Sequence, residues 1–125
     1  MKIAVSAKSK TADSLLDIRF GRCEYFQIYD GENDEVKVID NKGKLSGSGA
    51  GVAAAQQLVD EKVNLIITGS LGPNAYEIVE KAGIKIYKCR DVSISSALEK
   101  FNKDELLELV KPSRNGTGHG FRGGR

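Results

Sequence analysis

A cysteine and two arginines are the side chains of this sequence with the clearest chemistry. The segment Phe20-Gly21-Arg22-Cys23 places a thiol directly after Arg22 and four residues after Arg19. A thiolate is a soft ligand for iron, copper or zinc. The guanidinium groups are expected to lower the pKa of the thiol and to neutralise the sulfide or oxo groups of a bound cluster. The alternative is a buried structural thiol, with Arg22 at the surface, and the spacing alone leaves both readings open.

Glycine-rich segments are the second feature. Gly47, Gly49 and Gly51 lead into an alanine-rich stretch, and Gly69 and Gly72 bracket a short loop further along the chain. Bare backbone at the start of a helix can present N–H groups and the positive end of the helix dipole to an anion. The spacing matches neither a Walker A motif nor a complete GxGxxG motif. Close packing of a helix against a sheet through small residues is the alternative role.

The side-chain sets of common enzymes are missing from the pattern. Ser70 does not lie in a Gly-x-Ser-x-Gly frame, and the only histidine, His119, lies close to the C-terminus. A Ser/His/Asp hydrolase is therefore not predicted. Asp13, Asp17 and Asp91 are scattered, and we interpret them as solvated surface charges. The sequence favours a binding or carrier protein over a catalyst.

Length and hydropathy indicate one globular domain. The chain has 125 residues, enough for a hydrophobic core without disulfides. No apolar run approaches the roughly 20 residues of a membrane helix, and the first residues lack the apolar region of a signal peptide. We therefore expect a cytoplasmic protein without membrane contact. Cys23 and Cys89 form no zinc pattern and are expected to be free thiols, with Cys89 half-buried at a strand end.

Charge is distributed unevenly along the chain. The formal net charge is +2, but the residues from Lys111 onward contain four cations and no acid. We predict a folded domain over residues 1–110 and a disordered, cationic Gly/Arg-rich tail over residues 111–125. The tail resembles RGG-type segments that contact nucleic acid. Its one Phe and three arginines make a small footprint, so nucleic acid is not expected to be the main partner.

Hydrophobic periodicity predicts alternating strands and helices. We expect strands over 2–7, 24–30, 35–40, 63–68 and 84–88, and helices over 51–62, 74–82, from Ser93 or Ser95 through Phe101, and over 104–110. The stretch 11–18 is ambiguous. This order predicts a mixed sheet with helices on both sides. The loops around Gly47–Gly51, Gly69–Gly72 and Arg90–Ser93 are then expected to gather at one edge of the sheet, where ligands bind in open α/β folds.

Four blocks of this sequence resemble one known family over residues 1–110. They are the opening strand with Phe20-Gly21-Arg22-Cys23-Glu24-Tyr25-Phe26, then Gly49-Ala50-Gly51-Val52-Ala53-Ala54-Ala55, then Ile67-Thr68-Gly69-Ser70-Leu71-Gly72-Pro73-Asn74-Ala75, and last Ala82-Gly83-Ile84-Lys85-Ile86-Tyr87. The sequence is similar to the dinitrogenase iron-molybdenum cofactor biosynthesis and nitrogenase accessory factor domain family.

The resemblance implies a three-layer α/β/α ribonuclease H-like fold with a five-stranded mixed sheet and one antiparallel strand. It also implies non-catalytic binding, carriage or storage of an anionic iron–sulfur or molybdenum-containing cluster, with cluster-biosynthesis proteins as partners. Cluster-binding residues are then expected at Arg19, Arg22, Cys23, Gly49, Gly51, Gly69 and Gly72, with Cys23 as the metal ligand.

The sequence departs from the family pattern at two histidines. Many members carry a histidine shortly before the Phe-Gly-Arg block, where this chain has Ile18-Arg19, and another before the glycine-rich helix start, where it has Lys44-Leu45-Ser46. Without these histidines, Cys23 and the surrounding cations become the main candidates for holding a cluster. A small-anion or nucleotide-binding module, or tail-mediated RNA association, stays open as an alternative.

Overall fold

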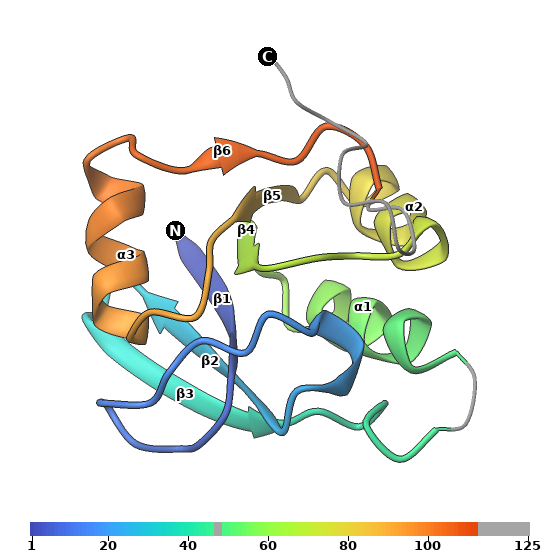
Figure 1. The fold of residues 1–125 in the computed structure, drawn as a ribbon, viewed down its shortest axis with the longest axis horizontal. Coiled ribbons are helices and arrows are strands. Elements are labelled where there is room, and N and C mark those ends of the chain that lie inside the picture. Colours follow the sequence, from blue (N-terminus) through green and yellow to red (C-terminus); the bar gives the residue numbers. More distant parts are fainter. Residues whose placement is uncertain (47–48, 113–125) are drawn as a thin grey trace.

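The computed structural model describes residues 1–46 and 49–112 and contains one mixed sheet with three α-helices (Figure 1). Its strands have the spatial order β3-β2-β1-β4-β5-β6. In chain order the elements are β1 Lys2–Ala7, the short 3-10 helix η1 Phe20–Arg22, β2 Tyr25–Asp30, β3 Glu35–Asp40, α1 Ala50–Asp60, β4 Leu65–Thr68, α2 Pro73–Lys81, β5 Lys85–Lys88, α3 Ile94–Asn102 and β6 Leu107–Glu108. The five predicted strands and the first three predicted helices are confirmed, with small shifts at their ends.

The centre of the sheet is parallel and its edges are antiparallel. Strand β1 pairs in parallel with β4, and β4 pairs in parallel with β5. The β2–β3 hairpin runs antiparallel beside β1, with Ala4 opposite Ile28. Among β1 to β5, β2 is the strand that runs against the others, as predicted. The predicted number of strands is wrong, because β6 adds a sixth strand antiparallel to β5.

Strand β6 also replaces the helix predicted over 104–110. Helix α3 ends at Asn102, and Asp104 adopts a left-handed conformation with φ of 60°. The chain then turns along β5, where the Leu109 amide donates to the Ile86 carbonyl at 2.7 Å. Leu109 enters the core, whereas Leu107 is 69% exposed. Pairing with a free sheet edge therefore outweighs the helical propensity of this leucine-rich segment.

The helices lie on opposite faces of the sheet, with α1 and α2 on one side and α3 on the other (Figure 1). One buried cluster joins α1 and α2 to residues of β1, β2, β4 and β5 such as Ala4, Phe26 and Ile66. The other cluster joins α3 to Ile3, Val5 and other residues that point the opposite way from the same strands. Alternating side chains in the strands thus give the two layers of core.

Helix starts differ in how they are capped. Of the two predicted starting residues, Ser93 caps α3 and accepts a hydrogen bond from the Ser96 amide at 3.1 Å. Helix α2 is preceded by Gly72 and begins with Pro73. Gly49 precedes α1 with φ of 79°, a left-handed conformation that favours glycine. The α1 and α2 starts have no side-chain cap from the described residues.

Within the described residues no helix is long and apolar enough to cross a membrane. The predictions for Gly47, for His119 and for a disordered tail fall mostly on residues 47–48 and 113–125, which lie outside the described part of the chain.

Candidate anion-binding cleft

An open cleft of about 410 Å³ lies between η1, the starts of α1 and α2, and the loop after β4. Its lining residues come from four sequence segments: Arg19, Phe20, Gly21 and Arg22; Gly49, Gly51 and Val52; Ser70 and Leu71; and Gly72, Pro73, Asn74 and Ala75. Strand β4 leads directly into this region, which therefore lies at the carboxyl end of a central parallel strand. This is the edge of an open α/β sheet at which ligands usually bind.

Two helix starts contribute backbone donors to the cleft. The first intrahelical bonds run from the Ala53 amide to Gly49 and from the Tyr76 amide to Gly72. The earlier amides of both helices have no hydrogen-bond partner within residues 1–46 and 49–112, and they include those of cleft-lining residues Gly51, Val52, Asn74 and Ala75. Two helix dipoles therefore place partial positive charge at one cleft, a suitable environment for an anion.

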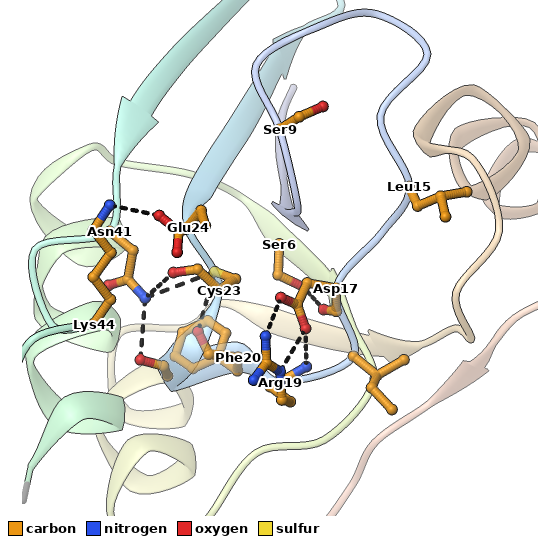
Figure 2. Close-up of polar contacts among 12 residues, drawn as sticks. Ser6, Ser9, Leu15, Asp17, Arg19, Phe20, Cys23, Glu24, Asn41 and Lys44 are labelled. Atoms are coloured by element: carbon orange, nitrogen blue, oxygen red, sulfur yellow. Dashed lines mark hydrogen bonds and ion pairs between the residues drawn. The ribbon is translucent and has the colours of Figure 1, made fainter.

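Arg19 reaches the cleft from a fixed position. Its backbone forms a parallel bridge with Ser70, and its side chain is 64% exposed. The Nε and Nη2 groups donate to the Asp17 carboxylate at 3.1 and 2.9 Å (Figure 2). The Nη1 group has no hydrogen bond to any described residue. Arg19 is therefore oriented by one carboxylate and still has a donor for a ligand.

The environment of Asp17 differs from the predicted one. Instead of a solvated surface charge, its side chain is 2% exposed. Burial opposes its ionisation, but hydrogen bonds and charge from Arg19, with a further contribution from Lys8, hold the pKa of Asp17 below its usual value. In the sequence, the position of an acid two residues before Arg19 was the signal that could have indicated this pairing. Spacing alone could not show that the acid is buried.

Arg22 also lines the cleft and is bonded to the loop after β3. Its Nη1 donates to the Ser46 carbonyl at 2.8 Å and to the Lys44 carbonyl at 3.4 Å. Lys44 in turn pairs with Glu24 at 2.8 Å. These contacts hold a second guanidinium group beside the start of α1.

Two glycines allow the cleft walls to approach closely. A β-carbon on Gly21 would lie 2.8 Å from the Gly51 amide nitrogen, so η1 packs directly on the first turn of α1. A β-carbon on Gly69 would lie 2.6 Å from the Ile18 Cα, which means that the loop after β4 packs on the backbone before Arg19. Gly69 supports the cleft from behind and is not among its lining residues. Gly72, by contrast, has open space around its missing β-carbon.

Cys23 lies beneath η1, away from the cleft. Its side chain is fully buried, and Sγ donates to the Phe20 carbonyl at 3.4 Å. The buried Asn41 amide donates to the Cys23 carbonyl at 2.9 Å and contacts Sγ at 3.7 Å (Figure 2). Burial raises the pKa of the Cys23 thiol to about 12. The prediction that nearby arginines lower this pKa is therefore wrong, because desolvation of the thiolate dominates and the charge of Asp17 acts in the same direction.

The fold thus brings most of the predicted site residues together. Arg19, Arg22, Gly49, Gly51 and Gly72 line one cleft, while Cys23 and Gly69 lie behind its walls. Ser70, Asn74 and the first-turn amides join the cleft through tertiary packing. Neither Ser70 nor Asn74 belongs to a nucleophile–base pair that could have identified it as a site residue from the sequence.

Side-chain ligands for a metal ion do not cluster in the described residues. No group of three or more His, Cys, Asp or Glu side chains in residues 1–46 and 49–112 is placed to hold one. Cys89 is also free and buried, and the prediction that it is half-buried is wrong. It lines a separate groove of about 300 Å³ with Lys88, Arg90, Lys100 and Glu105. Burial also raises the pKa of Cys89.

Comparison with known families gives a match over most of the chain. The family described as "Dinitrogenase iron-molybdenum cofactor" matches residues 1–104. An uncharacterized protein of Methanocaldococcus jannaschii is 34% identical over 109 residues, which cover 85% of this chain and 89% of the relative.

Two solved structures share the fold. The apo form of the orange protein from Desulfovibrio gigas has a TM-score of 0.86 and 30% identity, and the match covers 90% of this chain and 96% of that one. A NifB-like protein from Thermotoga, solved by NMR, has a TM-score of 0.81 and 33% identity, with coverage of 92% and 98%. The mixed sheet with its three helices is therefore an arrangement that this chain has in common with both.

Proposed function

The chain belongs to the dinitrogenase iron-molybdenum cofactor family, and from this premise we propose that it binds a preformed anionic metal–sulfur cluster in the cleft between η1, α1 and α2. The cluster is cargo that the protein carries or stores. The observation that supports this most directly is the convergence on one open cleft of two guanidinium groups and two helix starts that have no side-chain cap from the described residues.

The donor set of the cleft suits hydrogen bonding to a cluster better than coordination of its metals. Backbone amides and guanidinium groups donate hydrogen bonds and carry positive charge, but they are not metal ligands. The sulfide or oxo groups on the outside of an anionic cluster are acceptors for such donors. A cluster whose metals are already coordinated therefore fits this cleft, whether it is of the iron–sulfur or the molybdenum-containing type.

Cys23 is not part of the proposed contact surface. Its thiol is buried behind η1 and retains its proton at neutral pH, whereas the thiolate is the form that binds metals. Direct ligation by Cys23 would require η1 to move away from the core and the thiol to ionise. The role of Cys23 as a metal ligand stays a prediction, and the test below separates it from binding in the cleft.

The proposed role is binding without turnover. The described residues of the cleft supply positive charge and hydrogen-bond donors, and this combination suits retention of an anion. The names of the related proteins support the proposal that the bound cluster comes from, or is passed to, proteins of cluster biosynthesis.

The experiment that tests the proposal is anaerobic reconstitution with iron and sulfide, with and without molybdate, and separately with tetrathiomolybdate. After desalting, metal, acid-labile sulfide and the absorbance spectrum are measured. The variants are R19Q/R22Q in the cleft and C23S behind it, and the matched control is K88Q/R90Q at the cationic groove beside Cys89. We expect the wild type, C23S and the control to retain the chromophore and R19Q/R22Q to lose it.

Other results would redirect the proposal. Loss of the chromophore in C23S with retention in R19Q/R22Q would establish a thiolate-anchored cluster. Equal retention of sulfate or a nucleotide and of tetrathiomolybdate would indicate a general anion-binding module. No retention of any cluster by the wild type would contradict the proposal outright.

A further inference from the structure

Asp17 is a buried acid bonded to Arg19, which lines the cleft that binds anions in our proposal, and this placement calls for a physical explanation. A carboxylate is rarely buried unless it is paired, and it repels the anion that the cleft would hold. Asp17 is paired through three hydrogen bonds, all from Arg19: the backbone amide at 3.0 Å, Nε at 3.1 Å and Nη2 at 2.9 Å. All three of these hydrogen bonds thus come from one residue that lines the cleft.

The backbone of Asp17 is itself fixed to the centre of the sheet. Its amide donates to the Ser6 carbonyl at 2.9 Å, and its carbonyl accepts from the Ser6 hydroxyl at 2.6 Å. The same hydroxyl lies 2.7 Å from the Thr68 hydroxyl, and all three residues are buried. Asp17 is therefore anchored to the carboxyl ends of β1 and β4, and Figure 2 shows Ser6, Asp17 and Arg19 in succession.

We propose that Asp17 is a positioning residue that fixes which edge of the Arg19 guanidinium faces the ligand. The carboxylate takes the Nε–Nη2 edge, so the remaining Nη1 donor projects from a held plane. A free arginine on the surface has many rotamers and loses their entropy on binding. Because Asp17 already holds the Arg19 side chain in one orientation, less conformational entropy is lost when the anion binds. The cost is that the negative charge of Asp17 repels the anion. This inference rests on the proposed function, since it assigns the ligand to the same cleft.

The two effects of Asp17 on anion binding have opposite signs and different ranges. Its charge repels the anion through solvent, and salt screens this repulsion, with a screening length that falls from about 10 Å at 0.1 M to about 3 Å at 1 M ionic strength. Its hydrogen bonds to Arg19 are local and persist in salt. When the charge of Asp17 is removed, the loss of affinity caused by a less well oriented Arg19 should therefore be clearest at high ionic strength, where the repulsion is already screened.

The test measures the affinity for tetrathiomolybdate of wild type, D17N, R19Q and D17N/R19Q at about 0.1 M and about 0.5 M salt. Asparagine has the shape of aspartate, but its NH₂ group cannot accept from Arg19 Nη2. At the higher salt concentration we expect D17N to bind about tenfold more weakly than wild type, as for the loss of one charge-assisted hydrogen bond. In the R19Q background the same change should alter affinity less than about twofold, because the group that Asp17 orients is absent.

Three results would overturn the inference. Affinity of D17N equal to or above that of wild type at both salt concentrations would make Asp17 only a countercharge. The same loss in the R19Q background would make its role structural. Failure of the wild type to bind would remove the proposed function and this inference together, whereas binding by wild type with no effect of D17N would remove the inference alone.

A measurement on the wild type keeps the inference testable if D17N does not fold. In ¹⁵N NMR spectra the Nε–H of Arg19 should exchange with water more slowly than that of the exposed Arg90 without any ligand, because Asp17 accepts from it. Equal, fast exchange at both arginines would show that Arg19 is not held and would contradict the positioning role.

Discussion

The two sides of η1 have opposite character although they are built from five consecutive residues. On the outer side, Arg19 and Arg22 face an open cleft with uncapped helix starts. On the inner side, Cys23 and Phe20 are buried, and the thiol has a pKa raised by desolvation to about 12. The difference shows that proximity in sequence does not make one site. Water reaches the arginines and is excluded from the thiol, so the same neighbouring charges act in different dielectric environments.

The largest effect that we predict concerns the buried side and alkaline pH. In the unfolded chain the thiol ionises near pH 9, whereas in the folded protein it keeps its proton until about pH 12. Between these values the folded state binds more protons, so the free energy of unfolding falls as pH rises. The loss amounts to about 4 kcal/mol across this window. Denaturant unfolding of wild type and C23S at several pH values from about 8 to about 11 measures the part of this loss that falls below about pH 11.

Serine does not titrate in this range, so C23S should lack this part of the pH dependence and C89S should largely retain it. Identical pH slopes for wild type and C23S would mean that the thiol is accessible to water. The two sides of η1 would then not differ in their access to water.

The next largest effect concerns the outer side. Replacing both arginines in R19Q/R22Q removes two charged donors, each worth about 1.5 to 3 kcal/mol. We expect about a hundredfold loss of affinity for tetrathiomolybdate, because the two losses are not fully additive. Titration by absorbance at low salt checks this. A similar loss in K88Q/R90Q would show that any cationic cluster suffices and that the helix starts contribute little.

A third prediction tests the contact that separates the two sides. In G21A the new methyl group would meet the Gly51 backbone, and one of the two segments must move. We expect a destabilisation of about 1 to 3 kcal/mol, typical of overpacking, together with weaker anion binding. G72A is the matched control, because nothing lies within 4 Å of its β-carbon position. Thermal unfolding of both variants distinguishes them, and unchanged stability of G21A would contradict the tight packing of η1 on α1.

The smallest predicted effect concerns the uncapped start of α2. N74D places a carboxylate in the first turn of the helix, where it interacts favourably with the dipole by about 0.5 kcal/mol. The same carboxylate repels an anion in the cleft. We therefore expect a small gain in stability together with weaker binding of tetrathiomolybdate. Parallel unfolding and titration experiments measure the two changes, and tighter binding by N74D would show that the anion does not lie near this helix start.

The sequence by itself determined most of the architecture and the family. Alternation in residues 2–7 and 35–40, the apolar run before Gly69 and the alanine-rich helix each have a local pattern that matches their observed structure. It also identified the arginines and glycines that line the cleft, because cations and bare backbone have recognisable chemistry. These features depend on residue type and short-range spacing, which a sequence displays directly.

Tertiary structure alone decided which of these residues share a surface. Buried Cys23 contacts Asn41, and buried Asp17 is anchored through Ser6 to Thr68, and each of these contacts joins residues at least 11 positions apart in the sequence. Strand β6 formed because β5 offered a free edge to a segment with helical propensity. Solvent exclusion and long-range hydrogen bonding result from packing the whole chain. They gave Asp17 and Cys23 environments that their local sequence does not encode.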